Sequence, residues 1–258
     1  SDPSRGLGDV YKRQGSYLGT EFNQDEIEKE LKSVGANFET IQYEDLINKT
    51  AEFLSNETAI GWFQGRMEFG PRALGARSIL GDPRSDKMQK NLNLKVKYRE
   101  SFRPFAPSIL REDLSDWFNI NVDSPYMLLV ADVNSNKKIE MNEEQKKLFG
   151  IDKLNIKRSE IPAVTHVDYS ARIQTVTKET NKAYYDLISK FKEKTGCPVI
   201  VNTSFNVRGE PIVNSPTDAF NCFMGTELDY LVIGNCTLEK SKQDSNLKKD
   251  YTREFELD

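Results

Sequence analysis

One glycine- and arginine-rich stretch strongly limits what this chain can fold into and bind. Residues 65–84 read GRMEFGPRALGARSILGDPR and contain four glycines and four arginines, just after the apolar run 59–63. Glycine lets a backbone come close to a ligand, and the planar arginine fork matches phosphate and carboxylate oxygens. The stretch therefore predicts an anion site that follows a strand. A solvated basic loop is the alternative for this stretch taken alone.

Positive charge is concentrated in one part of the chain. The 258 residues carry 36 Lys and Arg against 40 Asp and Glu, a net charge of −4, so the whole chain gives no global case for nucleic-acid binding. Between Arg66 and Arg111, however, eleven Lys or Arg stand against four Asp or Glu. An acidic chain with such a segment is expected to direct it at a negative ligand. That ligand is either a small phosphorylated molecule or an RNA backbone.

Length and composition indicate a globular protein. The chain is long enough for one large or two modest domains with a sizeable core, and 37% of its residues are apolar. Because no apolar run reaches the length of a membrane helix and no signal-peptide pattern opens the chain, we expect a cytoplasmic protein without membrane contact. The cysteines Cys197, Cys222 and Cys236 lack metal-ligand spacing, which predicts reduced thiols. A single histidine, His166, excludes a multi-histidine metal site, and we expect no protein metal ligands, although a carboxylate-held Mg²⁺ stays open.

Hydrophobic periodicity predicts an α/β protein with about eight strands and five or six helices. The expected helices span 23–34, 44–56, 85–96, 112–118, 180–195 and a segment capped by Ser215; the expected strands span 38–42, 59–64, 126–133, 161–167, 171–177, 198–201 and 230–234. The nearly continuous apolar run 126–133 is interpreted as a buried strand, and the polar segment 134–160 as an exposed insertion. No Walker A, G-x-G-x-x-G or G-x-S-x-G motif follows a strand, which argues against a standard P-loop, Rossmann or hydrolase site.

Two later segments carry basic residues in constrained positions. In KYRESFRPFAPSIL, residues 97–110, the prolines hold Arg103 in a stiff extended frame. Without a role in binding, Lys97 would be a charge at the C-terminal end of a helix and Arg103 a charge on a surface loop. Arg172 stands in a predicted strand, where an inward guanidinium is costly unless it meets an anion.

Small polar residues follow another predicted strand. The strand 198–201 leads into Asn202, Ser204 and Asn206, and in open α/β sheets ligands bind at the carboxyl ends of strands. His166 also lies at a predicted strand end, where a lone histidine is more often a structural hydrogen-bonding residue than a catalyst.

Four motifs in series resemble the C-terminal region of the NodU/CmcH/TobZ family of O-carbamoyltransferases. They are GRMEFGPRALGARSILGDPR, KVKYRESFRPFAPSIL, IPAVTHVDYSARIQTV and NTSFNVRGEPIV, and the resemblance covers roughly residues 17–238. It implies an α/β fold, a YrdC-like twisted open mixed sheet flanked by helices, preceded by the tail of a truncated actin/sugar-kinase-like module. It also implies an enzyme whose YrdC-like domain binds carbamoyl phosphate and ATP and forms carbamoyl adenylate for transfer to an acceptor hydroxyl.

The resemblance divides the chain into parts. Residues 1–14 (SDPSRGLGDVYKRQ) resemble translated adapter DNA and are expected to be an artefactual or disordered leader. Residues 15–57 would be the tail and junction of the first, acceptor- and metal-binding module, 58–239 the YrdC-like carbamoyltransferase domain, and 240–258 a polar tail. ATP with Mg²⁺ is the implied cofactor, and Fe²⁺ is expected only in the missing N-terminal module.

The implied site residues come from several motifs. Lys97, Arg103 and Arg72 are expected to be catalytic, and Arg172, Asn202, Ser204, Arg66, His166 and Asn206 to bind substrate or nucleotide. The implied partners are carbamoyl phosphate, ATP and a hydroxyl acceptor (a sugar, an antibiotic or an oligosaccharide) that the missing module would hold; a homodimer is also compatible. An RNA-binding YrdC-like module and a threonylcarbamoyl-adenylate synthase are the alternatives.

Overall fold

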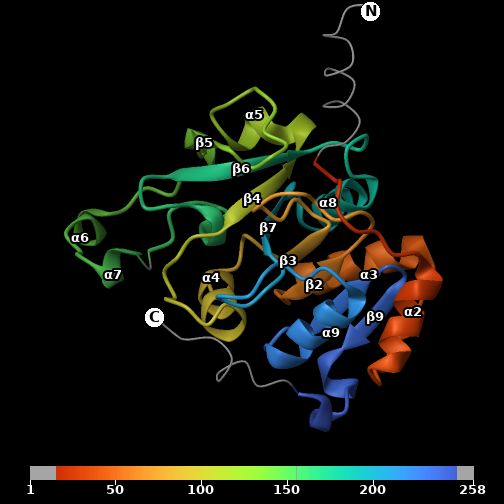
Figure 1. Cartoon of the computed structure of the whole chain (residues 1–258). Helices are drawn as coiled ribbons and strands as arrows, with labels where there is room; N and C mark the ends of the chain where they lie inside the picture. Colours follow the sequence, from red (N-terminus) through yellow and green to blue (C-terminus); the bar gives the residue numbers. More distant parts are fainter. Residues whose placement is uncertain (1–15, 155, 249–258) are drawn as a thin grey trace, which may run out of the picture.

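The computed structural model describes residues 16–154 and 156–248. Within these ranges, nine strands form one sheet in the order β1-β9-β8-β2-β3-β7-β4-β6-β5 (Figure 1). The strands are β1 (Glu39–Thr40), β2 (Ile60–Phe63), β3 (Arg77–Gly81), β4 (Ala106–Leu110), β5 (Leu129–Asp132), β6 (Ser170–Val176), β7 (Val199–Ser204), β8 (Tyr230–Ile233) and β9 (Cys236–Glu239). The pairs β2–β8 and β4–β6 are parallel and the other neighbours are antiparallel. The prediction of a mixed α/β sheet is therefore confirmed.

In the described part of the chain, eight helices accompany this sheet, and the four longest form two packed pairs. The helices are α2 (Gln24–Ser33), α3 (Tyr43–Ser55), α4 (Met88–Asn91), α5 (Leu114–Trp117), α6 (Glu143–Lys146), α7 (Ile151–Leu154), α8 (Lys182–Thr195) and α9 (Pro216–Gly225). α3 packs on α8, which contacts β4 and β7, while α2 packs on α9, which contacts β2 and β8. The capping boxes that begin α2 and α9 (Asn23 with Glu26 and Ser215 with Asp218) form as predicted.

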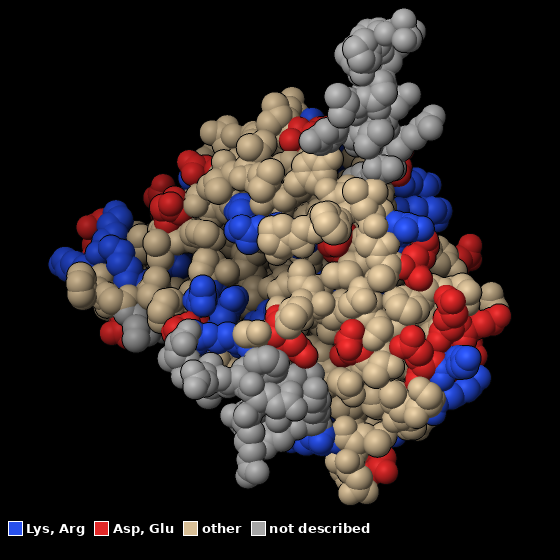
Figure 2. Space-filling view, in the orientation of Figure 1, with Lys and Arg blue, Asp and Glu red and all other residues tan. Residues whose placement is uncertain are grey.

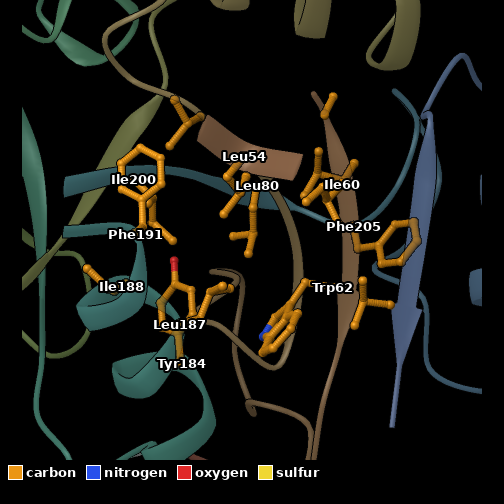
Figure 3. Packing of buried hydrophobic residues seen from close by; sticks show 14 of the residues in the cluster. Leu54, Ile60, Trp62, Leu80, Tyr184, Leu187, Ile188, Phe191, Ile200 and Phe205 are labelled. Atoms are coloured by element: carbon orange, nitrogen blue, oxygen red, sulfur yellow. The ribbon is translucent and has the colours of Figure 1, made fainter. Parts of the chain in front are cut away.

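Large, fully buried side chains fill the core between the sheet and its helices. Trp62 of β2 lies beside Tyr184 and Leu187 of α8, and Phe205 lies on the other side of the strand (Figure 3). Gly75 is required here, because its φ is +101° and a Cβ would come within 2.2 Å of the Tyr184 ring. The loop that precedes β3 is thus held tightly against the core.

Residues 16–57 are packed into the same core as the rest of the described chain. Leu31 of α2 and Leu46 and Leu54 of α3 belong to the main cluster of buried apolar residues, and β1 pairs with β9. The division of the chain near residue 57, and the kinase-like origin of the first part, stay predictions. The leader 1–14 and residues 249–258 of the polar tail lie outside the described residues.

The run 126–133 was expected to be a buried strand, and that prediction is wrong. β5 spans only Leu129–Asp132 and lies at the edge of the sheet, where it pairs with β6 alone. Its side chains are mostly exposed, with Val130 at 60%. An edge strand has only one neighbouring strand, so part of its surface faces solvent.

Other element predictions also need correction. Residues 161–167 contain a 3₁₀ turn (Pro162–Val164) in place of a strand. Three strands lie in regions without a predicted one: β3 inside the glycine- and arginine-rich stretch, β4 after the Arg103 segment, and β9 before the polar tail. The helix expected from Ser85 begins at Met88 and continues as a π-helical turn, Leu92–Val96.

The segment 134–160 carries the short helices α6 and α7, which lie at the edge of the molecule away from α3 and α8 (Figure 1). Its two ends are joined by a β-bridge between Lys138 and Ser159, and Arg158 and Ser159 are buried. Exposed side chains such as Phe149, at 93%, fit the predicted insertion, but its base is built into the fold. Among the described residues, no helix has the length and apolar character needed to cross a membrane.

Candidate functional site

A polar cleft of about 500 Å³ lies where several elements meet at one end of the strands of the sheet. The loop before β3, the loop before β4, the edge strand β5, the start of β6 and the end of β7 all contribute to it. The cleft brings together Arg72, Arg103, His166, Arg172, Asn202 and Ser204, which are six of the nine predicted site residues. The volume lies in the range of small-molecule pockets.

Four arginines line this cleft with few acidic neighbours. They are Arg72, Arg99, Arg103 and Arg172. Within the described ranges, one carboxylate oxygen lies within 4.0 Å of any of them, that of Glu100 at 3.9 Å from Arg103. A group of four guanidinium charges with a single carboxylate nearby in the described chain favours an anionic ligand.

Arg172 shows the electrostatic effect of this arrangement. Burial lowers the pKa of its guanidinium, and the nearby charge of Arg72 lowers it further. Its Nε is buried without a hydrogen-bond partner among the described residues, and its Nη2 has a weak contact with Met127 Sδ at 3.9 Å. An unpartnered donor next to a second positive charge indicates a position that an anion would stabilise.

The floor of the cleft is a hydrogen-bond network centred on Asn202. Asn202 Nδ2 donates to Ala73 O at 3.1 Å and to Gln174 Oε1 at 2.9 Å. Gln174 Oε1 also accepts from Ser108 Oγ at 2.6 Å, and Gln174 Nε2 donates to Leu74 O at 2.8 Å. These bonds fix the amide orientation of Asn202 and leave its buried Oδ1 without a partner in the part of the chain that the structure describes.

The loop that carries Arg72 is shaped by a buried carboxylate. Glu68 is 2% exposed, and its Oε1 accepts from the backbone N–H groups of Leu74 (2.5 Å), Ala76 (3.1 Å) and Arg77 (3.3 Å). The carboxylate of Glu68 thus holds the loop in its fold by binding three of its backbone N–H groups, and the loop carries Arg72 at the cleft. This role of Glu68 was not predicted from the sequence.

The other three arginines of the 65–84 stretch are used elsewhere. Arg66 pairs with Glu21 at 2.7 Å, outside the cleft. Arg77 is fully buried, donates to Gly65 O at 3.1 Å and stacks on the Phe63 ring, and burial lowers its pKa to about 10. Arg84 pairs with Asp82 at 2.6 Å. The stretch therefore divides into one cleft residue and three residues with structural contacts.

Lys97 lies behind the cleft wall. It is 4% exposed, and its Nζ donates to Ser204 O (2.5 Å), Ser204 Oγ (3.1 Å), Asn206 O (2.9 Å) and Asn206 Oδ1 (2.7 Å). Burial lowers the pKa of Lys97 to about 7, while these oxygens favour the ammonium form. In this structure Lys97 and Asn206 therefore fix the end of β7 and do not line the cleft.

His166 stands at the cleft, half-buried, in the turn that precedes β6. Burial lowers its pKa, Asp168 opposes this effect and Arg172 adds to it. The imidazole is therefore expected to be neutral at pH 7, so it offers one donor and one acceptor.

Besides Glu68, two residues of the site were missed in the sequence analysis. Arg99 lines the cleft, and the buried Asn93 donates through Nδ2 to Arg103 O at 2.8 Å. The signal for Arg99 was its position between Lys97 and Arg103 in the motif; Asn93 gave none, because its contacts depend on the π-helical turn. Within residues 16–154 and 156–248, no cluster of three or more His, Cys, Asp or Glu side chains is arranged to hold a metal ion.

Comparison with known proteins identifies relatives along most of the chain. A nodulation protein, NolO, of Bradyrhizobium diazoefficiens is 41% identical over 92% of this chain and 39% of its own length. An uncharacterized protein, sll1178, of Synechocystis is 57% identical over 95% of this chain and 40% of its own length. The 3'-hydroxymethylcephem-O-carbamoyltransferase of Streptomyces clavuligerus is 32% identical over 88% of this chain and 38% of its own length. The chain thus spans about two fifths of these relatives.

A family profile covers most of the chain as well. The profile described as "Carbamoyltransferase C-terminus" matches residues 51–240, which contain all four motifs of the predicted resemblance. The chain therefore belongs to the carbamoyltransferase family and carries its C-terminal region, as the motifs predicted.

Proposed function

We propose that this chain is the activating part of an ATP-dependent O-carbamoyltransferase. One carbamoyl phosphate, one ATP and one water would give carbamoyl adenylate, pyrophosphate and phosphate. In the sum, water attacks the phosphorus of carbamoyl phosphate, so its oxygen leaves in the released phosphate, and the carbamate oxygen bonds to the α-phosphorus of ATP. The bond from the carbamoyl oxygen to its phosphorus and the α–β phosphoanhydride bond break, and pyrophosphate leaves. The observation that carries this proposal is the cleft of four arginines, which have one carboxylate among the described residues within 4.0 Å.

The arginines would act by positioning and charge neutralisation. Both substrates carry phosphate groups, and their approach is unfavourable unless cations offset the repulsion. Arg72, Arg103 and Arg172 converge from three separate elements, so they could contact phosphate oxygens from several sides. Catalysis by preorganised positive groups needs no protein nucleophile.

Asn202 has a more specific proposed role. Its two amide hydrogens already donate to Ala73 O and Gln174 Oε1, so the side chain is not available to bind a phosphate oxygen. Its unpartnered Oδ1 is an acceptor, and the NH₂ of a carbamoyl group is a donor. Asn202 would therefore recognise the carbamoyl amide, and Ser204 would hydrogen-bond an oxygen of the substrate.

Mg²⁺ would enter with ATP, held by the phosphates, as is usual at nucleotide sites. The acceptor would be a hydroxyl on a sugar, an antibiotic or an oligosaccharide, in keeping with the named relatives, which include a hydroxymethylcephem carbamoyltransferase and nodulation proteins. Acceptor binding, Fe²⁺ and the final transfer would belong to the part of the longer relatives that this chain does not span. A cytoplasmic location and a homodimer stay expectations.

The geometry supports this proposal over an RNA-binding module. A surface for RNA would be a broad basic face with aromatic platforms, whereas these arginines line one cleft. Figure 2 shows Lys and Arg gathered near α4, with Asp and Glu over α2 at the other side of the same face. The family match also favours carbamoyl transfer over a threonylcarbamoyl-adenylate synthase.

The test is product analysis of the chain mixed with ATP, Mg²⁺ and carbamoyl phosphate. We expect pyrophosphate and carbamoyl adenylate, each dependent on carbamoyl phosphate. The Arg103→Ala variant should fold normally and lose the product, because its guanidinium is about half exposed and has one weak ion pair to lose. A folded wild-type chain that binds neither carbamoyl phosphate nor ATP would contradict the proposal, as would an Arg103→Ala variant with full activity.

A further inference from the structure

Arg99 is a cleft arginine outside the predicted set, and its surroundings show how it is held. Its Nε donates to Asn93 Oδ1 at 2.7 Å, its backbone N–H donates to Asn93 O at 3.0 Å, and its guanidinium lies 5.0 Å from the centre of the Phe105 ring. Its two terminal nitrogens have no hydrogen-bond partner within the described residues. The head of Arg99 is therefore fixed on one side and open on the other.

The same buried amide also holds the neighbouring arginine. Asn93 is 0% exposed, and its Nδ2 donates to Arg103 O at 2.8 Å and to Ser101 O at 3.1 Å. One side chain thus sets the backbone that carries Arg103 and the guanidinium of Arg99. Tyr98, the residue just before Arg99, adopts a positive φ of 47°, an uncommon conformation that the surrounding contacts must impose.

The cleft arginines form two groups. The charge that acts on Arg172 is that of Arg72. Burial, with the like charges of Arg103 and Arg208, lowers the pKa of Arg99 to about 10, and the charge of Glu100 opposes this shift. Geometry divides them in the same way: Asn93 holds both Arg99 and the backbone of Arg103, whereas Arg72 and Arg172 stand beside Ala73 and Gln174, the two partners of Asn202. Each group is therefore a separate place where an anion would offset positive charge.

The two groups also differ in their neighbours. Asn202, with its unpartnered Oδ1, is hydrogen-bonded to Ala73 and Gln174, which lie next to Arg72 in the loop and two residues from Arg172 in β6. The Arg99 group lies near Lys97, which stands two residues before Arg99 and is hydrogen-bonded to Ser204 of the cleft wall. An amide-bearing monophosphate fits the first group, and a more highly charged phosphate chain fits the second.

We propose that the cleft contains two anion subsites. Arg72 and Arg172 take carbamoyl phosphate, and Arg99 and Arg103 take the β- and γ-phosphates of the nucleotide, which leave as pyrophosphate. Arg99 is a substrate-binding residue in this arrangement, and Asn93 is a positioning residue that acts through Arg99 and Arg103. The proposal rests on the proposed function and adds a division of labour to it.

The test measures binding of inorganic pyrophosphate and of carbamoyl phosphate to the full chain by calorimetry. In the wild type both should bind, and saturation with one should leave the dissociation constant of the other within about threefold, because two sites do not compete. Arg99→Gln should weaken pyrophosphate binding by about tenfold or more and carbamoyl phosphate binding by less than about twofold. Arg172→Gln should show the reverse pattern, and Lys157→Gln, outside the cleft, should bind both anions as the wild type does.

Asn93→Ala provides a second readout. If Asn93 positions Arg99, this variant should lose pyrophosphate affinity selectively and keep its affinity for carbamoyl phosphate. A general loss of structure would weaken both anions alike and lower the melting temperature, which would contradict the positioning role while Arg99→Gln still tests the subsite. Mutual competition of the two anions, or equal effects of Arg99→Gln and Arg172→Gln on both, would overturn the division into subsites and leave the proposed function intact. A wild-type chain that binds neither anion would overturn both proposals.

Discussion

The cleft and the segment 134–160 both carry several basic side chains, but only one of them is arranged as a binding site. Three lysines of the segment have carboxylate partners: Lys137 with Glu160 at 3.0 Å, Lys146 with Glu143 at 2.7 Å, and Lys157 with Asp86 at 3.1 Å. The four cleft arginines share one contact with a carboxylate within the described residues, at 3.9 Å. The number of basic side chains in a region therefore does not identify a binding site. The scarcity of carboxylates near those side chains does.

The two regions also differ in how firmly their cations are held. In the segment, the ion-paired lysines project from short exposed helices and turns, where such pairs contribute little to stability. In the cleft, buried groups below the surface fix the loops that carry the arginines: Glu68 for the loop of Arg72 and Asn93 for the loop of Arg103. A preorganised cation loses less entropy when it binds an anion.

The largest effect is expected when a cleft cation is removed. Arg72→Gln keeps a polar side chain but removes the charge, and it should lower carbamoyl phosphate-dependent pyrophosphate release by about 100- to 1,000-fold, as removal of one preorganised donor does in other enzymes. Steady-state assays of pyrophosphate would measure this. Lys137→Gln removes a paired lysine as a matched control. If the two variants lost activity equally, the distinction between the regions would fail.

The next largest effect is expected when a carboxylate is added to the cleft. Val130 lines the cleft from the edge strand and is 60% exposed, so Val130→Glu places an anion near Arg172 without disturbing the core. The new carboxylate should compete with the ligand and weaken carbamoyl phosphate binding by about tenfold or more, while the melting temperature stays the same or rises.

Val130→Gln is the control for this experiment, because it has the same size without the charge. It should bind carbamoyl phosphate nearly as the wild type does. Equal losses of affinity in both variants would point to steric blocking of the cleft mouth and would remove the support for the carboxylate argument.

Sequence reasoning worked best where the determinants are local. The capping boxes at Asn23 and Ser215 need residues three positions apart, and both helices begin as predicted. The exposure of β5 was missed because an apolar run does not reveal whether its strand lies inside the sheet or at its edge. β3 was missed because glycines and arginines made residues 65–84 look like a loop, whereas Arg77 is fully buried.

The same limit explains the site. Six predicted residues of the motifs meet in one cleft, because the starts of β3, β4 and β6 and the end of β7 lie at the same end of the sheet. The motifs did not reveal that Glu21 pairs with Arg66 or that Ser204 and Asn206 enclose Lys97. Those contacts join positions that are distant in sequence, so they depend on how the sheet and loops assemble.

A smaller effect is expected from pH at Lys97. In the unfolded chain this lysine holds its proton up to about pH 10.5, whereas in the folded chain burial lowers its pKa to about 7. Between these values the unfolded state binds more protons, so the stability of the wild type should rise with pH, by up to about 1.4 kcal/mol per pH unit above pH 7. The charges of Cys222 and Glu210 oppose this lowering of the pKa, and the charge of Arg99 adds to it.

Lys97→Met separates this contribution from the rest of the protein. Urea unfolding of both proteins at pH 6, 7.5 and 9 would give the free energies of unfolding. The difference between wild type and variant should grow in favour of the wild type as pH rises. Parallel curves would mean that the oxygens of Ser204 and Asn206 keep the ammonium charged throughout, and the cleft would then have a permanent cation behind its wall.

The smallest effect is expected at the paired lysines. Lys157 and Asp86 are both largely exposed, with side chains at 45% and 63%, so water screens their attraction and the pair orders two long side chains at an entropic cost. Lys157→Gln should change the free energy of unfolding by no more than about 0.5 kcal/mol. It should also leave pyrophosphate release unchanged, since the charge that it removes is already neutralised. A clear loss of activity in this variant, measured beside Arg72→Gln, would mean that the paired lysines of 134–160 also serve the ligand, and that partner carboxylates do not separate structural cations from functional ones.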